Sequence, residues 1–159
     1  MAGKFMKMED LAAHIRLLKS KGKRVVMCNG VFDLLHVGHV RYFEDAKKHG
    51  DILIVVINDD VSARKLKGTS RPYMPEAERA ELLGALACVD FVTIHSGENM
   101  VGALTVLRPD VHAKGTDYTH ENLPERELDA KLGIEIAIVG GPKDHSSTGL
   151  AERVAGKKG

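Results

Sequence analysis

The stretch that decides the fold reads CNGVFDLLHVGH and occupies residues 28–39. An apolar run at residues 24–28 leads into it and an amphipathic segment at residues 37–49 follows, so it joins a predicted strand to a predicted helix. Gly30 lets the backbone turn tightly and approach a ligand where a Cβ atom would clash. Because the first N–H groups of a helix lack intrahelical partners, the chain near His36 forms a place where phosphate binds well.

Short apolar runs and amphipathic segments alternate along the whole chain. The runs are rich in Val and Ile and lie at residues 24–28, 52–57, 91–94, 110–113 and 134–139. Helix-length segments lie at residues 8–19, 37–49, 75–88, 99–107, 121–132 and 147–154. This order predicts an α/β fold, a single doubly wound parallel sheet of Rossmann-like type with helices on both faces. We expect a helical N-terminal extension at residues 1–22 and one domain at residues 23–159.

Composition argues against several classes of protein. The 159 residues carry 23 Lys and Arg against 22 Asp and Glu, a net charge of +1 that gives no general electrostatic case for nucleic-acid binding. Aromatic residues make up 4% of the chain without any Trp, so a base-stacking surface is not expected.

The longest clean apolar run, residues 52–57, is far shorter than the ~20 residues that span a bilayer, and the N-terminus lacks the apolar segment of a signal peptide. Cys28 and Cys88 form neither a disulfide framework nor a metal motif. We therefore expect a cytoplasmic protein with no membrane and no nucleic-acid partner.

The histidines of the HVGH segment, His36 and His39, have three competing interpretations. They are three residues apart and share a face if the helix has begun, with Gly38 between them leaving room for a phosphate. A structural pair is the default for two arbitrary histidines, and a zinc site would need further ligands that are not evident nearby. The interpretation we favour is phosphate binding with transition-state stabilisation, because imidazole supplies donors near its ordinary pKa of about 6.5.

Glycines and small polar residues follow the predicted strands at Asn29-Gly30, residues 58–60, Lys114-Gly115 and residues 140–141. Ligands of open parallel sheets bind outside the carboxyl ends of the strands, near the point where the strand order reverses. Glycine and Asn also make ordinary turns, but their recurrence together with the HVGH segment favours a ligand site.

The segments GVFD at residues 30–33 and HVGH at residues 36–39 resemble the signature of the cytidylyltransferase-like nucleotidyltransferases. The resemblance continues to about residue 154 and implies that residues 23–159 are a nucleotidyltransferase domain. Within the family, KGTSRP at residues 67–72 and KGTDY at residues 114–118 are most similar to the adenylyltransferases that make ADP-heptose from D-glycero-β-D-manno-heptose 1-phosphate. These often carry a fused sugar kinase; no kinase-sized segment exists here, so we expect the stand-alone form.

The resemblance also implies a reaction and its participants. ATP and a sugar 1-phosphate would react by direct in-line transfer of AMP, with pyrophosphate leaving. Mg²⁺ would accompany the ATP and mostly keep its waters, so no protein metal site is expected. A homo-oligomer, dimer or tetramer, is the expectation for the family. The nucleotide would feed ADP-heptose and lipopolysaccharide synthesis.

Roles for individual residues follow from the same resemblance. The residues expected to act in catalysis are His36, His39 and Lys67. Those expected to bind the nucleotide are Asn29, Gly30, Val31, Phe32, Gly38, Arg79, Lys114, Gly115, Asp117, Ser146, Ser147 and Thr148. Those expected to bind the acceptor substrate are Asp33, Lys65 and Arg71.

Several of these residues also have structural interpretations. Lys65 and Lys67 fall in what would be a flexible loop after the second strand and could be solvated surface charges. Arg79 could be an exposed helix charge paired with Glu76. The SST segment at residues 146–148 could be a plain helix cap. We expect the isolated histidines to be surface or loop residues: His95, His112 and His145.

Two other functions compete with adenylyl transfer to a heptose phosphate. One is a cytidylyltransferase acting on glycerol 3-phosphate or another small alcohol phosphate. Such enzymes carry a basic residue just before the Val-Asp pair, where this chain has Ala87 and Cys88, which favours ATP. The other is a catalytically silent nucleotide-binding protein, which commonly lacks a motif histidine or the phosphate-binding lysine; neither is missing here.

Overall fold

A five-stranded sheet forms the centre of the computed structural model, which describes residues 3–156. All its strand pairs are parallel and their order is β3-β2-β1-β4-β5. The strands are β1 (Val25–Gly30), β2 (Ile52–Asn58), β3 (Phe91–His95), β4 (Val111–Lys114) and β5 (Glu135–Ile138). The predicted fold class and all five predicted strands are confirmed. The first two residues of the expected extension and the last three of the expected domain lie outside the described residues.

The central strands are buried on both faces, as their sequences predict. In β2, ILIVVIN, six of seven residues are buried, and β1 on its flank is buried from Val25 to Cys28. β-Branched side chains suit such strands because both faces of a parallel sheet are covered by helices.

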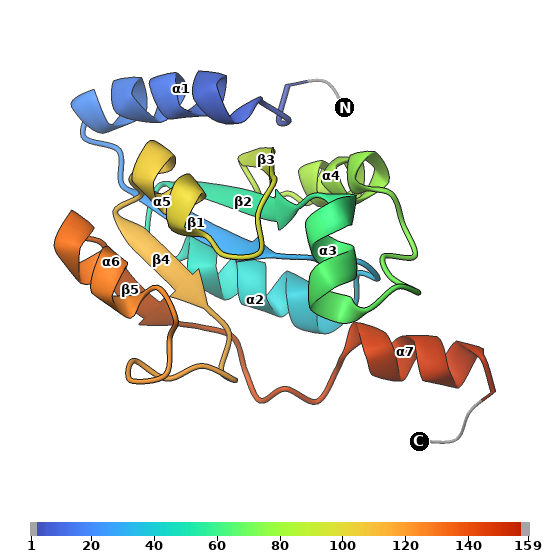
Figure 1. Ribbon diagram of the computed structural model, residues 1–159. Helices are drawn as coiled ribbons and strands as arrows, with labels where there is room; N and C mark the ends of the chain where they lie inside the picture. Colours follow the sequence, from blue (N-terminus) through green and yellow to red (C-terminus); the bar gives the residue numbers. More distant parts are fainter. Residues whose placement is uncertain (1–2, 157–159) are drawn as a thin grey trace.

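Helices cover both faces of the sheet (Figure 1). One face packs on α2 (Val37–Lys47) and α4 (Glu76–Ala85). The other packs on α1 (Met8–Ser20), α5 (Val101–Leu107) and α6 (Arg126–Leu132). Two further helices, α3 (Asp60–Lys67) and α7 (Ser147–Val154), lie toward the carboxyl ends of the strands. Among the helices described, none combines the length and the apolar character that a membrane crossing needs.

Helix α3 differs from the expectation of a flexible loop after the second strand, so that placement of Lys65 and Lys67 was wrong. The side chain of Asp59 accepts a hydrogen bond from Ser62 N at 2.8 Å and caps the helix. Asp60 in the first turn and basic residues in the last turn suit the helix dipole. Gly68, with φ of 102°, ends the helix in a conformation that favours glycine. Local chemistry therefore makes this segment a helix.

Helix α1 is packed into the core rather than appended to it. Leu11 and Ile15 are fully buried and contact the cluster that includes Leu104 of α5. Just before the helix, Phe5 forms a parallel bridge to Val92, so the chain also covers the outer edge of β3. The helical N-terminal segment therefore helps to complete the fold.

The strand order reverses between β1 and β4. From β1 the chain proceeds to β2 and β3 on one side, whereas from β4 it proceeds to β5 on the other. Connections that diverge in this way leave a crevice at the carboxyl ends of the two central strands. These ends carry Asn29-Gly30 and Lys114.

We expect Ile15→Ala to lower the free energy of unfolding by about 2–5 kcal/mol, because it opens a cavity in the core. Leu17→Ala on the same helix is the matched control, since Leu17 is 50% exposed whereas Ile15 is 0% exposed. Urea unfolding of both variants measures the effect. Equal, small losses would show that α1 is a dispensable appendage.

Candidate active site

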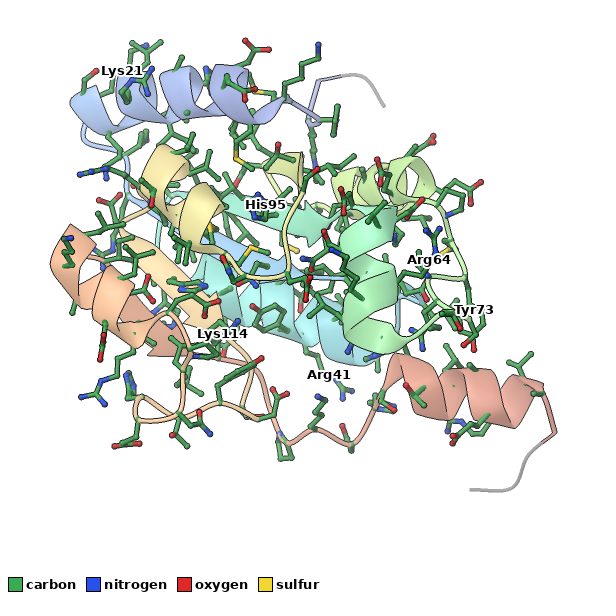
Figure 2. All side chains as sticks on the ribbon, in the orientation of Figure 1. Lys21, Arg41, Arg64, Tyr73, His95 and Lys114 are labelled. Carbon is green, nitrogen blue, oxygen red and sulfur yellow. The ribbon has the colours of Figure 1, made fainter. Side chains whose placement is uncertain are left out.

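A cavity of about 690 Å³ opens at the carboxyl edge of the sheet, at the point where the strand order reverses. Figure 2 labels Lys114 at the end of β4 and Arg41 on α2, both on its wall. Most residues expected to act in the site line this one cavity: Asn29, Gly30, Val31, Phe32, Asp33, His36, Gly38, His39, Lys67, Arg71, Lys114, Gly115, Asp117, Ser146, Ser147 and Thr148. Segments far apart in sequence therefore meet at the predicted place.

The turn after β1 is shaped by Phe32. Its φ of 48° lies in the left-handed region, which costs energy for a residue with a bulky side chain. The turn brings the Phe32 ring edge-on to the His39 ring, with centroids 5.3 Å apart, and against Phe43 at 4.9 Å. A Cβ atom on Gly30 would lie 2.9 Å from the Phe32 ring, so any other residue there would force the ring to move. The strained turn thus packs the Phe32 ring against His39.

His36 and His39 stack on each other at the start of α2. Their ring centroids are 3.9 Å apart and the planes are inclined by 24°. His36 caps the helix, because its Nδ1 accepts a hydrogen bond from Gly38 N at 3.1 Å. An accepting Nδ1 carries no hydrogen, so Nε2 of His36 is the donor. A Cβ on Gly38 would lie 2.9 Å from the His36 ring, so the glycine between the histidines allows this cap.

Both histidines have lowered pKa values. The pKa of His39 is lowered to about 4; burial is the largest cause, and repulsion by His36 when it is protonated, by Lys143 and by Lys67 acts in the same direction. Burial also lowers the pKa of His36, followed by charge on His145 and Lys143. At neutral pH the stacked rings are therefore uncharged and offer one N–H each, in contrast to the ordinary pKa expected from the sequence. A bound anion would raise both pKa values.

The start of α7 forms a second wall of the cavity. Ser146 caps the helix by accepting from Gly149 N at 2.9 Å, so the predicted cap is confirmed. The hydroxyl of Ser147 donates to the carbonyl oxygen of Leu34 at 2.9 Å and ties α7 to the segment before α2. Two helix N-termini, those of α2 and α7, therefore border the same cavity.

Asp33 holds the segment between α3 and α4 in place. Its carboxylate accepts from Arg71 Nε at 2.6 Å and from the backbone N–H groups of Tyr73 and Met74 at 2.9 Å. Burial alone would raise the pKa of Asp33, but these hydrogen bonds outweigh it and the pKa lies below its ordinary value. The carboxylate is occupied by the protein, so its own role is to fix Arg71 on the cavity wall.

Lys65 and Arg79 do not line the cavity. Lys65 pairs with Glu98 at 3.3 Å and both side chains are largely exposed. Arg79 is fully buried rather than an exposed charge paired with Glu76. Its guanidinium donates to the carbonyl oxygens of Val31, Asn58 and Met74, and pairs with Asp60 at 2.7 Å. Arg79 therefore holds the strand ends that shape the site instead of touching the cavity.

The end of β4 supplies another part of the cavity wall. Lys114 is nearly buried, its ammonium lies 4.4 Å from the centre of the Tyr118 ring, and burial is the largest cause that lowers its pKa. Asp117 pairs with Lys143 at 2.9 Å. A Cβ on Gly115 would lie 3.0 Å from the Asp117 carboxylate, so the glycine allows this close turn.

Of the histidines expected at the surface or in loops, His145 does lie in the loop before α7, whereas His112 does not. His145 lines the cavity with its ring centroid 6.1 Å from that of His36. His112 is fully buried in β4. Lys143 and Glu125 also line the cavity, although the sequence analysis did not single them out, and so does Tyr118, which it named only as the end of the KGTDY segment. The sequence signal that could have suggested Lys143 is its positive charge two residues before His145.

The strand order defines a Rossmann-like α/β protein. The cavity at the point where this order reverses, bordered by two helix N-termini, is its candidate ligand site. The chain belongs to the cytidylyltransferase-like family, whose pattern matches residues 27–148. This match extends from β1 to the first turn of α7, so it contains the HVGH and SST segments. The family resemblance drawn from these motifs is confirmed.

Comparison with individual proteins agrees with this family assignment. The chain is 42% identical to the bifunctional protein HldE of Geotalea uraniireducens, over 95% of this chain and 31% of that protein. It is 43% identical to HldE of Pelobacter propionicus, over 91% of this chain and 30% of that protein. The chain thus spans about a third of the length of these curated relatives. It is also similar to the crystal structure of the lipopolysaccharide core biosynthesis protein from Thermoplasma volcanium, with a TM-score of 0.63 and 31% identity over 74% of this chain and 97% of that chain.

We expect acid to destabilise the protein through His39 between about pH 6.5 and pH 5. Its pKa is about 4 in the folded chain against an ordinary 6.5, so the unfolded chain takes up a proton first as the pH falls. The free energy of unfolding then decreases by at most about 1.4 kcal/mol per pH unit in this window. Urea unfolding should show a steeper loss for the wild type than for His39→Gln, while the exposed His49→Gln follows the wild type. Parallel curves for the wild type and His39→Gln would contradict the lowered pKa.

Proposed function

We propose that this chain is an adenylyltransferase that transfers AMP from ATP to a heptose 1-phosphate, giving ADP-heptose and pyrophosphate. The observation that carries the proposal is the convergence of two helix N-termini and the stacked His36–His39 pair on one cavity. Such an arrangement suits a triphosphate because helix N-termini and imidazole N–H groups are donors. The sugar phosphate rests on the similarity to HldE and on the KGTSRP and KGTDY segments.

The reaction would be a direct displacement. An oxygen of the sugar phosphate forms a bond to the α-phosphorus of ATP, while the bond from that phosphorus to the bridging oxygen breaks. The electron pair of the broken bond leaves with pyrophosphate. Because the attacking oxygen is already anionic, no serine or cysteine nucleophile is needed, and positioning and charge stabilisation do most of the work.

The residues on the cavity wall can supply that stabilisation. Nε2 of His36 and the N–H group of the His39 ring would donate to phosphate oxygens where charge builds up on the leaving group. Lys67 at the end of α3 and Lys143 before α7 would add positive charge. Arg71, held by Asp33, would take part in binding the acceptor phosphate.

Mg²⁺ would enter with ATP. Within residues 3–156 no group of three or more His, Cys, Asp or Glu side chains is arranged to hold a metal ion. On the cavity wall, Asp33 and Asp117 are already paired with Arg71 and Lys143. This donor set fits an ion carried by phosphate oxygens and its own waters, with Lys67 and the imidazoles around the phosphates. When bound, such an ion neutralises charge on the phosphate oxygens.

The choice between ATP and CTP rests on the relatives rather than on the cavity. Ala87 and Cys88, the positions that favoured ATP, precede β3 at its amino end and do not line the cavity. A cytidylyltransferase is therefore the alternative to be tested. A silent nucleotide-binding protein is less well supported, because both motif histidines and Lys67 are present on the cavity wall.

Assembly and location are part of the same proposal. A homo-oligomer, dimer or tetramer, is supported by exposed apolar side chains on the neighbouring helices α1 and α5, namely Leu17, Val101 and Val106. A cytoplasmic location is supported by the use of ATP as substrate.

A side-by-side turnover assay tests the function. With Mg²⁺ present, we expect pyrophosphate release from ATP and D-glycero-β-D-manno-heptose 1-phosphate, and much less from CTP or glycerol 3-phosphate. Preferred turnover of CTP with glycerol 3-phosphate would establish the cytidylyltransferase instead. Nucleotide binding without turnover of any pair would favour the silent protein.

We expect His39→Ala to lower kcat by about 10²–10³ and to raise the KM for ATP far less, because a preorganised donor acts mainly on charge in the transition state. His49→Ala at the far end of α2 is the control and should match the wild type. Melting temperature, metal content and single-turnover rate are measured on one preparation. A structural histidine would lower stability with near-normal turnover, and a zinc ligand would leave the wild type with stoichiometric zinc. A stable variant that keeps more than about a third of the rate would contradict the catalytic role.

A further inference from the structure

A chain of polar side chains runs beneath the cavity from α6 to the end of β1. Asp129 Oδ2 lies 2.8 Å from His112 Nδ1, and His112 Nε2 lies 2.9 Å from Asn29 Oδ1. The side chains of His112 and Asp129 have no exposed surface, and neither residue lines the cavity. Asn29 does line it. The pair therefore reaches the cavity only through Asn29.

The direction of these hydrogen bonds follows from Lys114. Its ammonium lies 3.4 Å from the same atom of Asn29, and an ammonium can only donate. The shared atom is therefore the amide oxygen, so His112 Nε2 must carry a hydrogen and donate it. The second contact, from Nδ1 to the Asp129 carboxylate, needs a further hydrogen between the two atoms.

Both acceptor positions of the Asn29 oxygen are thus occupied, by His112 and Lys114. Asn29 lines the cavity, and among residues 3–156 its amide nitrogen donates no hydrogen bond to the protein, so this nitrogen remains available to a ligand. If the amide rotated by 180°, it would present an acceptor instead of two donors. Lys114 opposes that rotation, because its ammonium would then face an N–H group of the amide, and His112 opposes it as long as Nε2 carries its hydrogen.

Such a pair is costly to bury and contributes little stability on balance, so a role in holding a functional group is a reason to keep it. The charged groups around it are Lys114, which approaches Asn29, and Glu125, whose Oε2 is buried without a partner. Asp129 also keeps one buried oxygen, Oδ1, without a partner. Neither carboxylate contacts the Asn29 amide, whose orientation depends on His112 and Lys114 alone.

We propose that His112 and Asp129 are positioning residues for nucleotide binding, which fix the Asn29 amide so that its N–H group donates to the bound nucleotide. The proposal rests on the proposed function for the identity of the ligand. It assigns no chemistry to the pair itself, which acts through Asn29.

Two near-isosteric variants of His112 test it. The amide nitrogen of Gln reaches about as far as Nε2 and can still donate to Asn29, whereas that of Asn reaches only as far as Nδ1. We expect His112→Asn to weaken MgATP binding about fivefold to tenfold, the effect of one lost hydrogen bond, and His112→Gln to stay within about twofold of the wild type. Leu107→Ala, at the buried end of α5, should lower stability without changing the dissociation constant. Equal binding by both His112 variants would overturn the proposal.

A double-mutant cycle separates positioning from a merely structural role. Asn29→Ala should weaken MgATP binding as much as His112→Asn, and the combined variant should bind no worse than Asn29→Ala alone. If the combined variant weakens binding by the product of the two separate effects, the proposal is overturned, because His112 would then act by another route than Asn29. If His112→Asn does not fold, the double change His112→Leu with Asp129→Leu takes its place, since removing both partners avoids an unpaired buried carboxylate.

The side-chain amide resonances of Asn29 in the ligand-free protein give a readout that needs no nucleotide. We expect the chemical shifts of these resonances to change in His112→Asn and to stay near their wild-type values in His112→Gln. Unchanged resonances in His112→Asn would overturn the positioning role even if ATP binds. A wild-type protein that binds neither ATP nor CTP would overturn the proposed function, and the resonances would then still decide whether the pair holds the amide.

Discussion

The geometry of the cavity depends on one buried charge, the guanidinium of Arg79. It contacts the turn after β1 at Val31, the end of β2 at Asn58, the start of α3 at Asp60 and the segment before α4 at Met74. A buried guanidinium stays charged and needs acceptors in a fixed planar arrangement. The four segments are therefore held at set distances from one another. The histidine motif and the end of α3 take their places on this rigid edge.

The cavity wall carries charged side chains of both signs, and two of its carboxylates are paired with cations of the protein. Asp33 and Asp117 are neutralised by Arg71 and Lys143. The stacked histidines are uncharged at neutral pH because burial and nearby cations lower their pKa values. An anionic ligand would reverse the second of these causes, so the positive charge of the site can increase as the ligand arrives.

Local chemistry was enough to predict most elements. The bounds of α7 agree with the prediction because Ser146 caps the helix at the position where the motif begins. Helix α3 was missed although its cap, Asp59, and its basic last turn are both visible in the sequence. The reason is that its eight residues follow β2 almost directly, and the family resemblance suggested a loop.

The amino-acid sequence by itself determined the parallel α/β architecture and the placement of the nucleotide motif, because apolar periodicity and glycine positions act over a few residues. Only the tertiary structure decided the roles of Arg79 and His112. The partners of Arg79 come from four other segments, and those of His112 lie 17 and 83 residues away. When the partners of a polar side chain lie far away in the sequence, the residues next to it do not show whether that side chain is exposed or buried. Its role depends on which strands lie side by side, and that order is set by packing of the whole chain.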